Sequence, residues 1–311
     1  MNILGIETSC DETAASVVKD GRTILSNVVV TSLKKHAKFG GIIPEIASRH
    51  HLEFINSIVE QSLIDAHIKL NDIDAVAVTA SPGLIGSLLV GTSFARALSF
   101  ALNKPLVEID HIKAHLYANF LLEKSPKLPA IGLIVSGGHT SLYQITSFKN
   151  FKLLGHTLDD AAGEAFDKVA RILNLGYPGG PVIDRLAQKS SKNNNIRFSC
   201  APLKDTFNFS FSGIKTAVLY YTKSNPKAKV EDVVFAFQES VVQNLVYKCL
   251  DACQKLKTKT LLVGGGVAAN SSLRNKLQEA AGKSGIETFF PPIALCVDNA
   301  AMVAGMAYHY V

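Results

Sequence analysis

The chain has 311 residues, which is too long for one small domain and suits two. Hydrophobic residues make up 47% of it and charged residues 19%, so large apolar cores are available and bulk disorder is excluded. The five cysteines are odd in number and form no CxxC pair, which indicates a reducing compartment. No basic segment followed by an apolar core opens the sequence, so we expect a cytoplasmic protein without a signal peptide.

The net charge of +6 is concentrated in the second part of the chain. Residues 1–110 carry 9 basic and 12 acidic side chains, a balance of −3, whereas residues 111–311 carry 23 and 14, a balance of +9. Between residues 185 and 229, nine Lys or Arg accompany a single acid, Asp205. Such a stretch could follow a phosphate backbone or form an ordinary solvated surface, and this feature alone favours neither.

Strands and helices are expected to alternate in the first part of the chain. The pattern predicts strands at 3–7, 14–19, 23–30 and 74–79, and helices at 44–66 and 84–102. The second helix nearly has the length of a membrane span. Because Arg96 and several hydroxyl side chains interrupt it, we interpret it as a core helix or a partner-facing one.

The second part of the chain repeats this plan. Strands are expected at 131–135, 140–146, 151–154, 259–263 and 286–290. Helices are expected at 161–173, 182–189, 213–256 with a break near 225–226, 270–282 and 298–310. Because each half begins with a strand–turn–strand unit, the sequence predicts a duplicated α/β architecture rather than one long sheet.

Three turns rich in glycine or hydroxyl groups are candidates for holding an anion. Residues 8–13 join the first two strands, residues 136–138 lie at the equivalent place in the second half, and residues 264–266 lead from a strand into a helix. Exposed amides in such turns, and a helix N-terminus, favour negative charge. None of the turns matches a Walker A or GxGxxG pattern, but together they are typical of a nucleotide cleft between duplicated domains.

His111 and His115 are four residues apart, so on a helix their imidazoles share a face and can bind one metal ion. The plainer alternative is one exposed and one packed histidine. A zincin metalloprotease needs Glu directly after the first histidine, and Ile112 excludes that class. A kinase or ATPase would hold magnesium on phosphates and carboxylates rather than on two imidazoles.

Eight segments in chain order resemble the TsaD family, the bacterial tRNA threonylcarbamoyladenosine transferases. They are residues 1–18, 39–48, 135–140, 158–169, 176–184, 211–215, 264–273 and 297–304. That family has the actin, hexokinase and Hsp70-like (ASKHA) fold. The resemblance therefore implies one domain of residues 1–110 with 298–311, another of residues 111–297, a nucleotide cleft between them, and partner-facing helices at 45–66 and 84–102.

The resemblance also implies an activity. Family members transfer a threonylcarbamoyl group from threonylcarbamoyl-AMP to N6 of the adenosine at tRNA position 37, beside the anticodon, and release AMP. Their one divalent metal ion, iron(II) in preference to zinc, falls on His111, His115 and Asp298. Their substrate-contacting positions fall on Ile134, Val135, Ser136, Gly137, Gly138, Asp167, Gly180, Asp184 and Asn270. Expected partners are tRNA, a TsaB-like paralogue and a TsaE-like ATPase, with no membrane.

This sequence departs from the family pattern between the two histidines, where Lys113-Ala114 replaces the more frequent Glu-Gly. Asp11 and Glu12, in the first turn, are candidates to position phosphate or metal-bound water, or to manage the amine proton.

Several of these residues have plainer alternatives. Asp298, Asp184 and Asn270 could be helix caps, and Asp167 could be a solvated surface acid. An ATPase or kinase on the same fold, or a non-catalytic nucleotide-binding scaffold, remains an alternative function.

Overall fold

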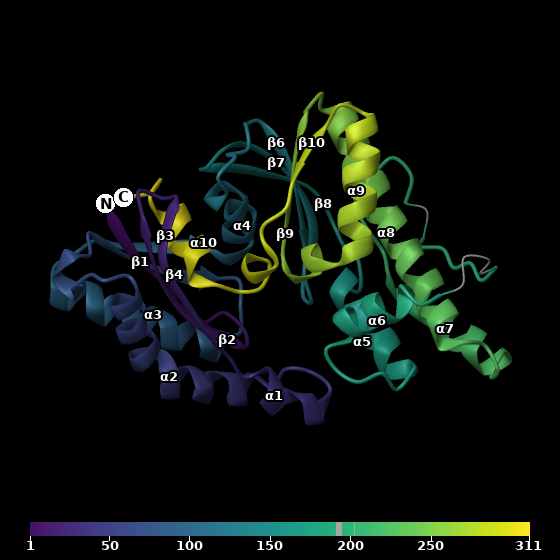
Figure 1. The fold of residues 1–311 in the computed structure, drawn as a ribbon, viewed down its shortest axis with the longest axis horizontal. Helices are drawn as coiled ribbons and strands as arrows, with labels where there is room; N and C mark the ends of the chain where they lie inside the picture. Colours follow the sequence, from purple (N-terminus) through teal and green to yellow (C-terminus); the bar gives the residue numbers. More distant parts are fainter. Residues whose placement is uncertain (191–194, 202) are drawn as a thin grey trace. The chain divides into compact units, whose positions relative to one another are not determined.

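The computed structural model describes residues 1–190, 195–201 and 203–311, and the chain forms two compact units (Figure 1). Unit 1 comprises Met1–Ser125 and Pro291–Val311, and unit 2 comprises Pro126–Phe290. The boundaries expected from the sequence, after residue 110 and before residue 298, differ from these bounds. Helix α4 (His111–Tyr117) packs against β5 (Leu106–Asp110) and α10 (Ala300–Ala307), and it therefore belongs to unit 1.

The sheet of unit 1 has the strand order β3-β2-β1-β4-β5. Strands β1 (Asn2–Glu7), β2 (Glu12–Lys19) and β3 (Thr23–Thr31) form an antiparallel meander, while β4 (Ala75–Ser81) and β5 run parallel to β1. The expectation missed β5, because its five residues, LVEID, mix apolar and charged side chains over too short a length.

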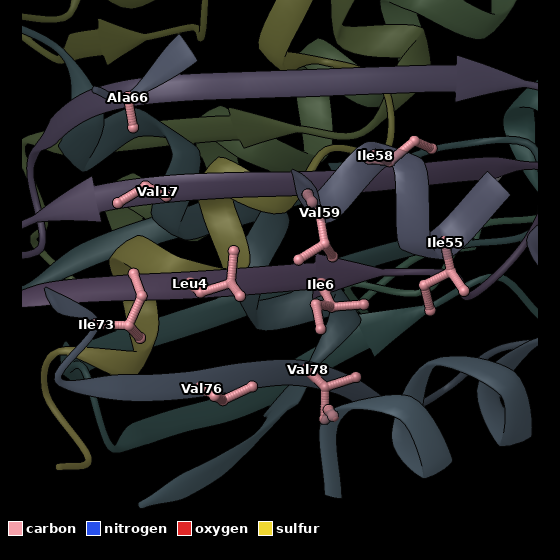
Figure 2. Packing of buried hydrophobic residues seen from close by; sticks show 12 residues of the cluster. Leu4, Ile6, Val17, Ile55, Ile58, Val59, Ala66, Ile73, Val76 and Val78 are labelled. Carbon is pink, nitrogen blue, oxygen red and sulfur yellow. The ribbon is translucent and has the colours of Figure 1, made fainter. Parts of the chain in front are cut away.

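Two layers of helices cover this sheet. Helices α2 (Pro44–Asp65) and α3 (Ile85–Leu102) pack on one face and α10 on the other (Figure 1). Side chains alternate along β1, so Leu4 and Ile6 enter the α2 side, where Ile55, Ile58 and Val59 meet them (Figure 2). Gly5 faces α10 so closely that a Cβ there would lie 2.5 Å from the carbonyl oxygen of Ala300. The shorter helices of this unit are α1 (Leu33–His36) and the 3₁₀ turns Ala37–Phe39, Leu70–Asp72, Ala118–Leu121 and Ile293–Leu295.

Helix α3 is not a core helix. Its small residues Ser87, Gly91 and Ala95 are buried, whereas Ile85 and Phe100 are 87% and 90% exposed. Within the described residues it is the single helix long and apolar enough to cross a membrane, and 17% of it is buried. The large apolar side chains therefore lie on the outer face of unit 1.

Unit 2 repeats the plan of unit 1 with the strand order β10-β9-β6-β7-β8. Strands β6 (Ala130–Val135), β7 (Thr140–Ser147) and β8 (Asn150–His156) form the meander, while β9 (Thr260–Gly264) runs parallel to β6 and β10 (Glu287–Phe289) parallel to β9. The helices are α5 (Ala162–Ile172), α6 (Gly179–Ala187), α7 (Ser212–Ser224), α8 (Val230–Lys255) and α9 (Ser271–Lys283), with a 3₁₀ turn at Gly266–Ala269. The matching strand orders confirm the duplication, and the gap between α7 and α8 confirms the expected break.

Candidate functional site

The two histidines are placed by the start of α4. Strand β5 ends at Asp110, whose Oδ1 accepts a 3.0 Å hydrogen bond from the backbone amide of Lys113 and caps the helix. The helix therefore begins at His111, and both imidazoles project from one face, with ring centroids 4.6 Å apart in an edge-on arrangement. Both rings are buried, so the alternative of one exposed histidine is wrong. The Lys113-Ala114 departure leaves the cap intact, because the cap uses only the backbone of Lys113.

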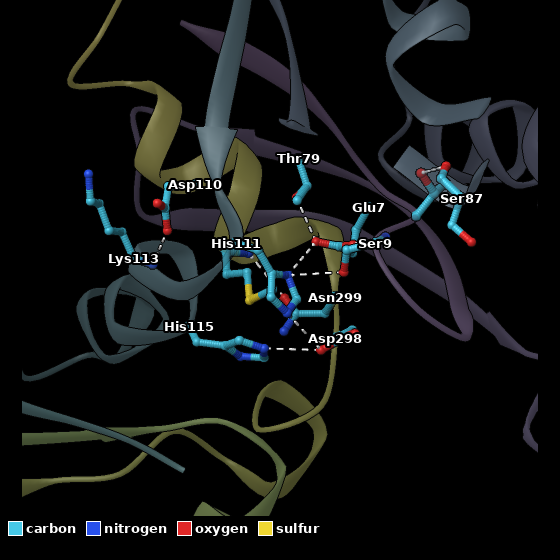
Figure 3. A network of polar contacts seen from close by, with 12 residues as sticks. Glu7, Ser9, Thr79, Ser87, Asp110, His111, Lys113, His115, Asp298 and Asn299 are labelled. Carbon is cyan, nitrogen blue, oxygen red and sulfur yellow. Dashed lines mark hydrogen bonds and ion pairs between the residues drawn. The ribbon is translucent and has the colours of Figure 1, made fainter. Parts of the chain in front are cut away.

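Asp298 completes the group. Its Oδ1 lies 3.0 Å from Nε2 of His115 and 3.5 Å from Nε2 of His111 (Figure 3). One ligand atom from each of the three residues lies within 4.8 Å of the others. The cap of α10 is Asn299, whose Oδ1 accepts from the amide of Met302 at 3.1 Å, so the helix-cap alternative for Asp298 is wrong. Two imidazoles and a carboxylate fit iron or zinc and leave coordination positions open.

Glu7 lies behind His111 and was missed by the sequence-based assignment of the site. Its carboxylate is fully buried, and Oε2 lies 3.1 Å from Nδ1 of His111 (Figure 3). Burial raises the pKa of Glu7, but the charge and hydrogen bond of the adjacent His111, together with the hydrogen bond from Thr79, outweigh it and leave that pKa lowered. Burial lowers the pKa of His111, but the carboxylates of Asp298 and Glu7 raise it to about 9. The signal in the sequence was a charged residue at the end of a strand whose preceding residues, Ile3 to Ile6, carry no polar side chain.

Asp11 and Glu12 lie within electrostatic reach of Asp298. Burial, with the charges of Asp298 and Asp11, raises the pKa of Glu12 to about 10. Burial also raises the pKa of Asp11, and the two side chains share a hydrogen bond. The pair can therefore hold a proton beside the histidine cluster.

His51 forms hydrogen bonds to both ends of the turn that carries these two acids, and the sequence did not single it out. Its Nε2 donates to the carbonyl oxygen of Cys10 at 3.1 Å, and its Nδ1 lies 2.8 Å from the hydroxyl of Thr13. Burial lowers the pKa of His51 and so favours the neutral ring, in which Nδ1 accepts from the hydroxyl of Thr13.

The predicted substrate residues lie in unit 2, around the end of β6. Ile134 and Val135 have fully buried side chains, so only their backbone could contact a ligand. In the following turn, Gly137 and Gly138 have open space where a Cβ would be. Gly265, at φ +90°, approaches the carbonyl oxygen of Val135 so closely that a Cβ would lie 2.6 Å from it. The turns at 136–138 and 264–266 are thus neighbours.

The polar residues of this group hold neighbouring backbone. Asp167 accepts from the amide of Gly179 at 2.7 Å, and burial raises its pKa, so it is not a solvated surface acid. Asp184 lies inside α6 and does not cap it; its carboxylate accepts instead from the amide and hydroxyl of Ser271, at 3.1 and 2.9 Å.

Asn270 caps α9, as the plainer alternative predicted, by accepting from the amide of Leu273 at 2.9 Å. Its side-chain amide also donates to Oε1 of Gln238 at 2.8 Å. Gln238 is a buried residue of α8 that the sequence-based assignment missed. Gly180 has open space around it.

Comparison with known proteins identifies the family of this chain. A family model described as TsaD, tRNA N6-adenosine threonylcarbamoyltransferase, matches residues 23–305. The chain is 50% identical over 311 residues to the tRNA N6-adenosine threonylcarbamoyltransferase of Clostridioides difficile (strain 630), covering 98% of this chain and 92% of that protein. It is 51% identical over 308 residues to the protein of the same name from Syntrophus aciditrophicus (strain SB), covering 98% and 90%.

Solved structures of low sequence identity show the same fold. Component A of the (R)-2-hydroxyglutaryl-CoA dehydratase of Acidaminococcus fermentans aligns with a TM-score of 0.58 at 16% identity, covering 100% of this chain and 98% of that chain. Full-length HypF in its phosphate- and nucleotide-bound form aligns with a TM-score of 0.66 at 15% identity, covering 99% of this chain and 46% of that chain. The family resemblance and the expected duplicated α/β fold are confirmed.

Proposed function

Because this chain belongs to the TsaD family of tRNA N6-adenosine threonylcarbamoyltransferases, we propose that it transfers threonylcarbamoyl from threonylcarbamoyl-AMP to N6 of adenosine 37 in tRNA. The observation that carries the proposal is the cluster of His111, His115 and Asp298 in a chain about half identical to enzymes of that name. The reaction forms a bond between N6 and the carbamoyl carbon and breaks the bond from that carbon to the phosphate oxygen. AMP leaves with the electron pair, and the amine loses a proton.

The three ligands His111, His115 and Asp298 would hold one divalent ion. The donor set suits iron and zinc alike, and we propose iron(II), which the family resemblance favours. A bound ion supplies Lewis-acid polarisation and orients the carbamoyl and phosphate oxygens.

Residues of unit 2 would hold the donor. The amides of Gly137 and Gly138 would stabilise the phosphate charge that develops as AMP leaves, while the amide of Ser136 holds the turn by donating to the carbonyl oxygen of His139 at 2.8 Å. Backbone at Ile134, Val135 and Gly180, with the side chains of Asp167, Asp184 and Asn270, would complete the donor site. Asp11 would accept the proton that N6 loses, because burial raises the pKa of its carboxyl. Glu12, whose pKa is raised to about 10, would stay protonated and donate a hydrogen bond to Asp11.

We propose that the basic side chains around the end of α7 bind tRNA phosphates. Lys223, Lys227 and Lys229 are exposed, and no ion pair involves them within the described residues. Lys215 differs, because it is half-buried and lies 3.5 Å from Asp160. Replacing the three exposed lysines by Gln should reduce the slope of log affinity against log salt by roughly 0.7–0.9 for each phosphate that the variant no longer neutralises. The same change at the exposed Lys257 and Lys259 is the control, and an unchanged slope in the triple variant would move the tRNA site elsewhere.

The exposed apolar side chains of α2 and α3 are our candidate for the partner surface. Leu52 and Ile64 on α2, with Ile85, Leu89 and Phe100 on α3, are each at least 57% exposed. Large apolar faces of this kind mark interaction sites. By family analogy the partners would be a TsaB-like paralogue and a TsaE-like ATPase, and the protein would act in the cytoplasm.

Nucleoside mass spectrometry of tRNA from cells depleted of this protein tests the function. We expect threonylcarbamoyladenosine to fall, and to return with the wild-type chain but not with the double variant His111→Ala, His115→Ala. The purified double variant should also lose a near-stoichiometric iron or zinc content, while His156→Ala, at an exposed position of β8, should keep it. An undiminished nucleoside would instead favour an ATPase, a kinase or a non-catalytic scaffold.

A further inference from the structure

We propose that Glu7 is a positioning residue of the metal centre, whose carboxylate holds His111 with the proton on Nδ1 and presents Nε2 to the ion. This inference rests on the metal site proposed above. It concerns a residue that is no ligand itself and acts through one of the ligands.

Three segments of unit 1 bring hydrogen-bond donors to this one carboxylate (Figure 3). The backbone amide of Ser9, in the turn after β1, donates to Oε1, and the hydroxyl of Thr79, on β4, donates to Oε2 at 2.6 Å. Nδ1 of His111, on α4, is 3.1 Å from the same Oε2. An uncompensated buried carboxylate costs several kcal/mol, on the order of the whole stability of many domains, so these contacts are what allow Glu7 to be fully buried.

The chemistry of these contacts fixes the tautomer of His111. A backbone amide can only donate, and an ionised carboxylate can only accept, so the ring nitrogen that faces Glu7 must carry a hydrogen. Nδ1 of His111 therefore keeps its hydrogen when the ring gives up one proton to bind a metal ion. The lone pair is then on Nε2, the atom that lies 3.5 Å from Oδ1 of Asp298. A metal-binding histidine usually donates its other ring N–H to such a carboxylate, which orients the ring and raises its basicity.

The second histidine lacks this arrangement. Nδ1 of His115 is buried without a hydrogen-bond partner among the described residues, and its ring is held by packing at 1% exposure. The two ligands of α4 are therefore unequal: an outer carboxylate fixes His111, and the surrounding core fixes His115. A change at Glu7 should consequently act on the metal through His111.

Glu7→Gln tests the role at nearly constant shape. The amide of Gln has one acceptor oxygen, which can accept either from the amide of Ser9 or from Thr79 and His111. Its NH2 group then faces the remaining donor or donors, with which it cannot form a hydrogen bond. We expect the dissociation constant for Zn(II), measured by competition with a chromophoric chelator, to rise about 10–100-fold. The control Glu108→Gln removes the same charge from β5, where Glu108 pairs with Arg96 and is 46% exposed, and should change the constant by less than about threefold. Equal affinity in Glu7→Gln and wild type would overturn the proposal.

A measurement on the wild-type chain keeps the proposal testable if Glu7→Gln does not fold. In the Zn(II)-loaded protein with ¹⁵N-labelled histidine, NMR should place a slowly exchanging proton on Nδ1 of His111, assigned by its absence from His111→Gln. A proton on Nε2 with the metal on Nδ1 would refute the positioning role. Neither measurement uses transferase activity, so a failure of the proposed function would be recognised separately.

Discussion

Gln238 offers a direct test of how the substrate residues of unit 2 are held. Its Oε1 accepts a 2.8 Å hydrogen bond from the side-chain amide of Asn270, and the two residues are 3% and 9% exposed. The other end of the Asn270 side chain caps α9 through the amide of Leu273. One buried bond therefore fixes the rotamer of a residue that serves as a helix cap and as a predicted substrate contact.

Gln238→Met keeps the length of the side chain and removes its acceptor. The Asn270 amide is then buried with an unused donor, which costs about 1–3 kcal/mol, and the gain from an apolar side chain in a buried position offsets part of this. We expect a net loss of about 1–2 kcal/mol. For a unit the size of residues 126–290, each kcal/mol shifts Tm by about 2–4 °C, so Tm should fall by roughly 2–8 °C.

The assay is thermal and urea denaturation followed by far-UV circular dichroism, because the chain has no tryptophan to report by fluorescence. Calorimetric titration with AMP measures the site, and we expect its affinity to fall at least threefold as Asn270 loses its fixed orientation. Gln243→Met, at an exposed position of the same helix, is the control and should stay within about 0.5 kcal/mol of wild type. If Gln238→Met matches this control in both stability and AMP affinity, the reasoning from the buried bond is wrong.

Three further substitutions test other contacts. Gly5→Ala should destabilise the protein by about 1–3 kcal/mol in urea denaturation, because its Cβ would meet the backbone oxygen of Ala300 at 2.5 Å. Gly138→Ala should leave stability within about 0.5 kcal/mol but weaken AMP binding in calorimetry, because its Cβ meets no atom within 4 Å and would occupy the space of a ligand. Asp159→Asn should cost about 1 kcal/mol at neutral pH, because the carboxylate accepts from Ser210, from the amide of Phe211 at 2.7 Å and from Ser212. Burial raises the pKa of Asp159, but these hydrogen bonds outweigh it and leave the pKa lowered. A carboxylate with a lowered pKa stabilises the folded protein at any pH above its pKa in the unfolded chain. This stabilisation is lost as the pH falls through the pKa of the folded protein. Urea midpoints of Asp159→Asn and wild type should therefore differ at pH 7 and converge below about pH 4.

The sequence predicted the duplication of the fold because the strand–turn–strand pattern, with its glycine-containing turns, occurs twice in the chain. The role of α3 was not readable, since it reverses the usual amphipathic arrangement. Its small residues face the sheet, with Gly91 against Thr8, and its large apolar residues face outward. Composition and length are the same for a core helix and for this one, so the sequence left both interpretations open.

The three metal ligands also differ in how far the sequence alone could predict them. The spacing of His111 and His115 is local and predicts a shared helix face without further knowledge. Asp298 is 183 residues from His115, and only the family resemblance associated it with the pair. Helix-cap rules favoured a different role for it, because Asp is a good cap and the helix was expected to begin there. In the structure the cap is the next residue, Asn299, and Asp298 is left to face the imidazoles.

A polar residue within an apolar segment can be recognised from the sequence, but its role cannot be read from the sequence alone. Glu7 ends an apolar strand and Lys248 lies in an apolar stretch of α8, so both need partners inside the protein. Lys248 donates to the carbonyl oxygens of Leu203 and Thr206, and this anchors a loop. Glu7 instead contacts a ring whose opposite nitrogen faces Asp298. The pattern thus identifies which side chains must be paired, and the chemistry of the partner, which only the fold supplies, separates a structural anchor from a residue that tunes a site.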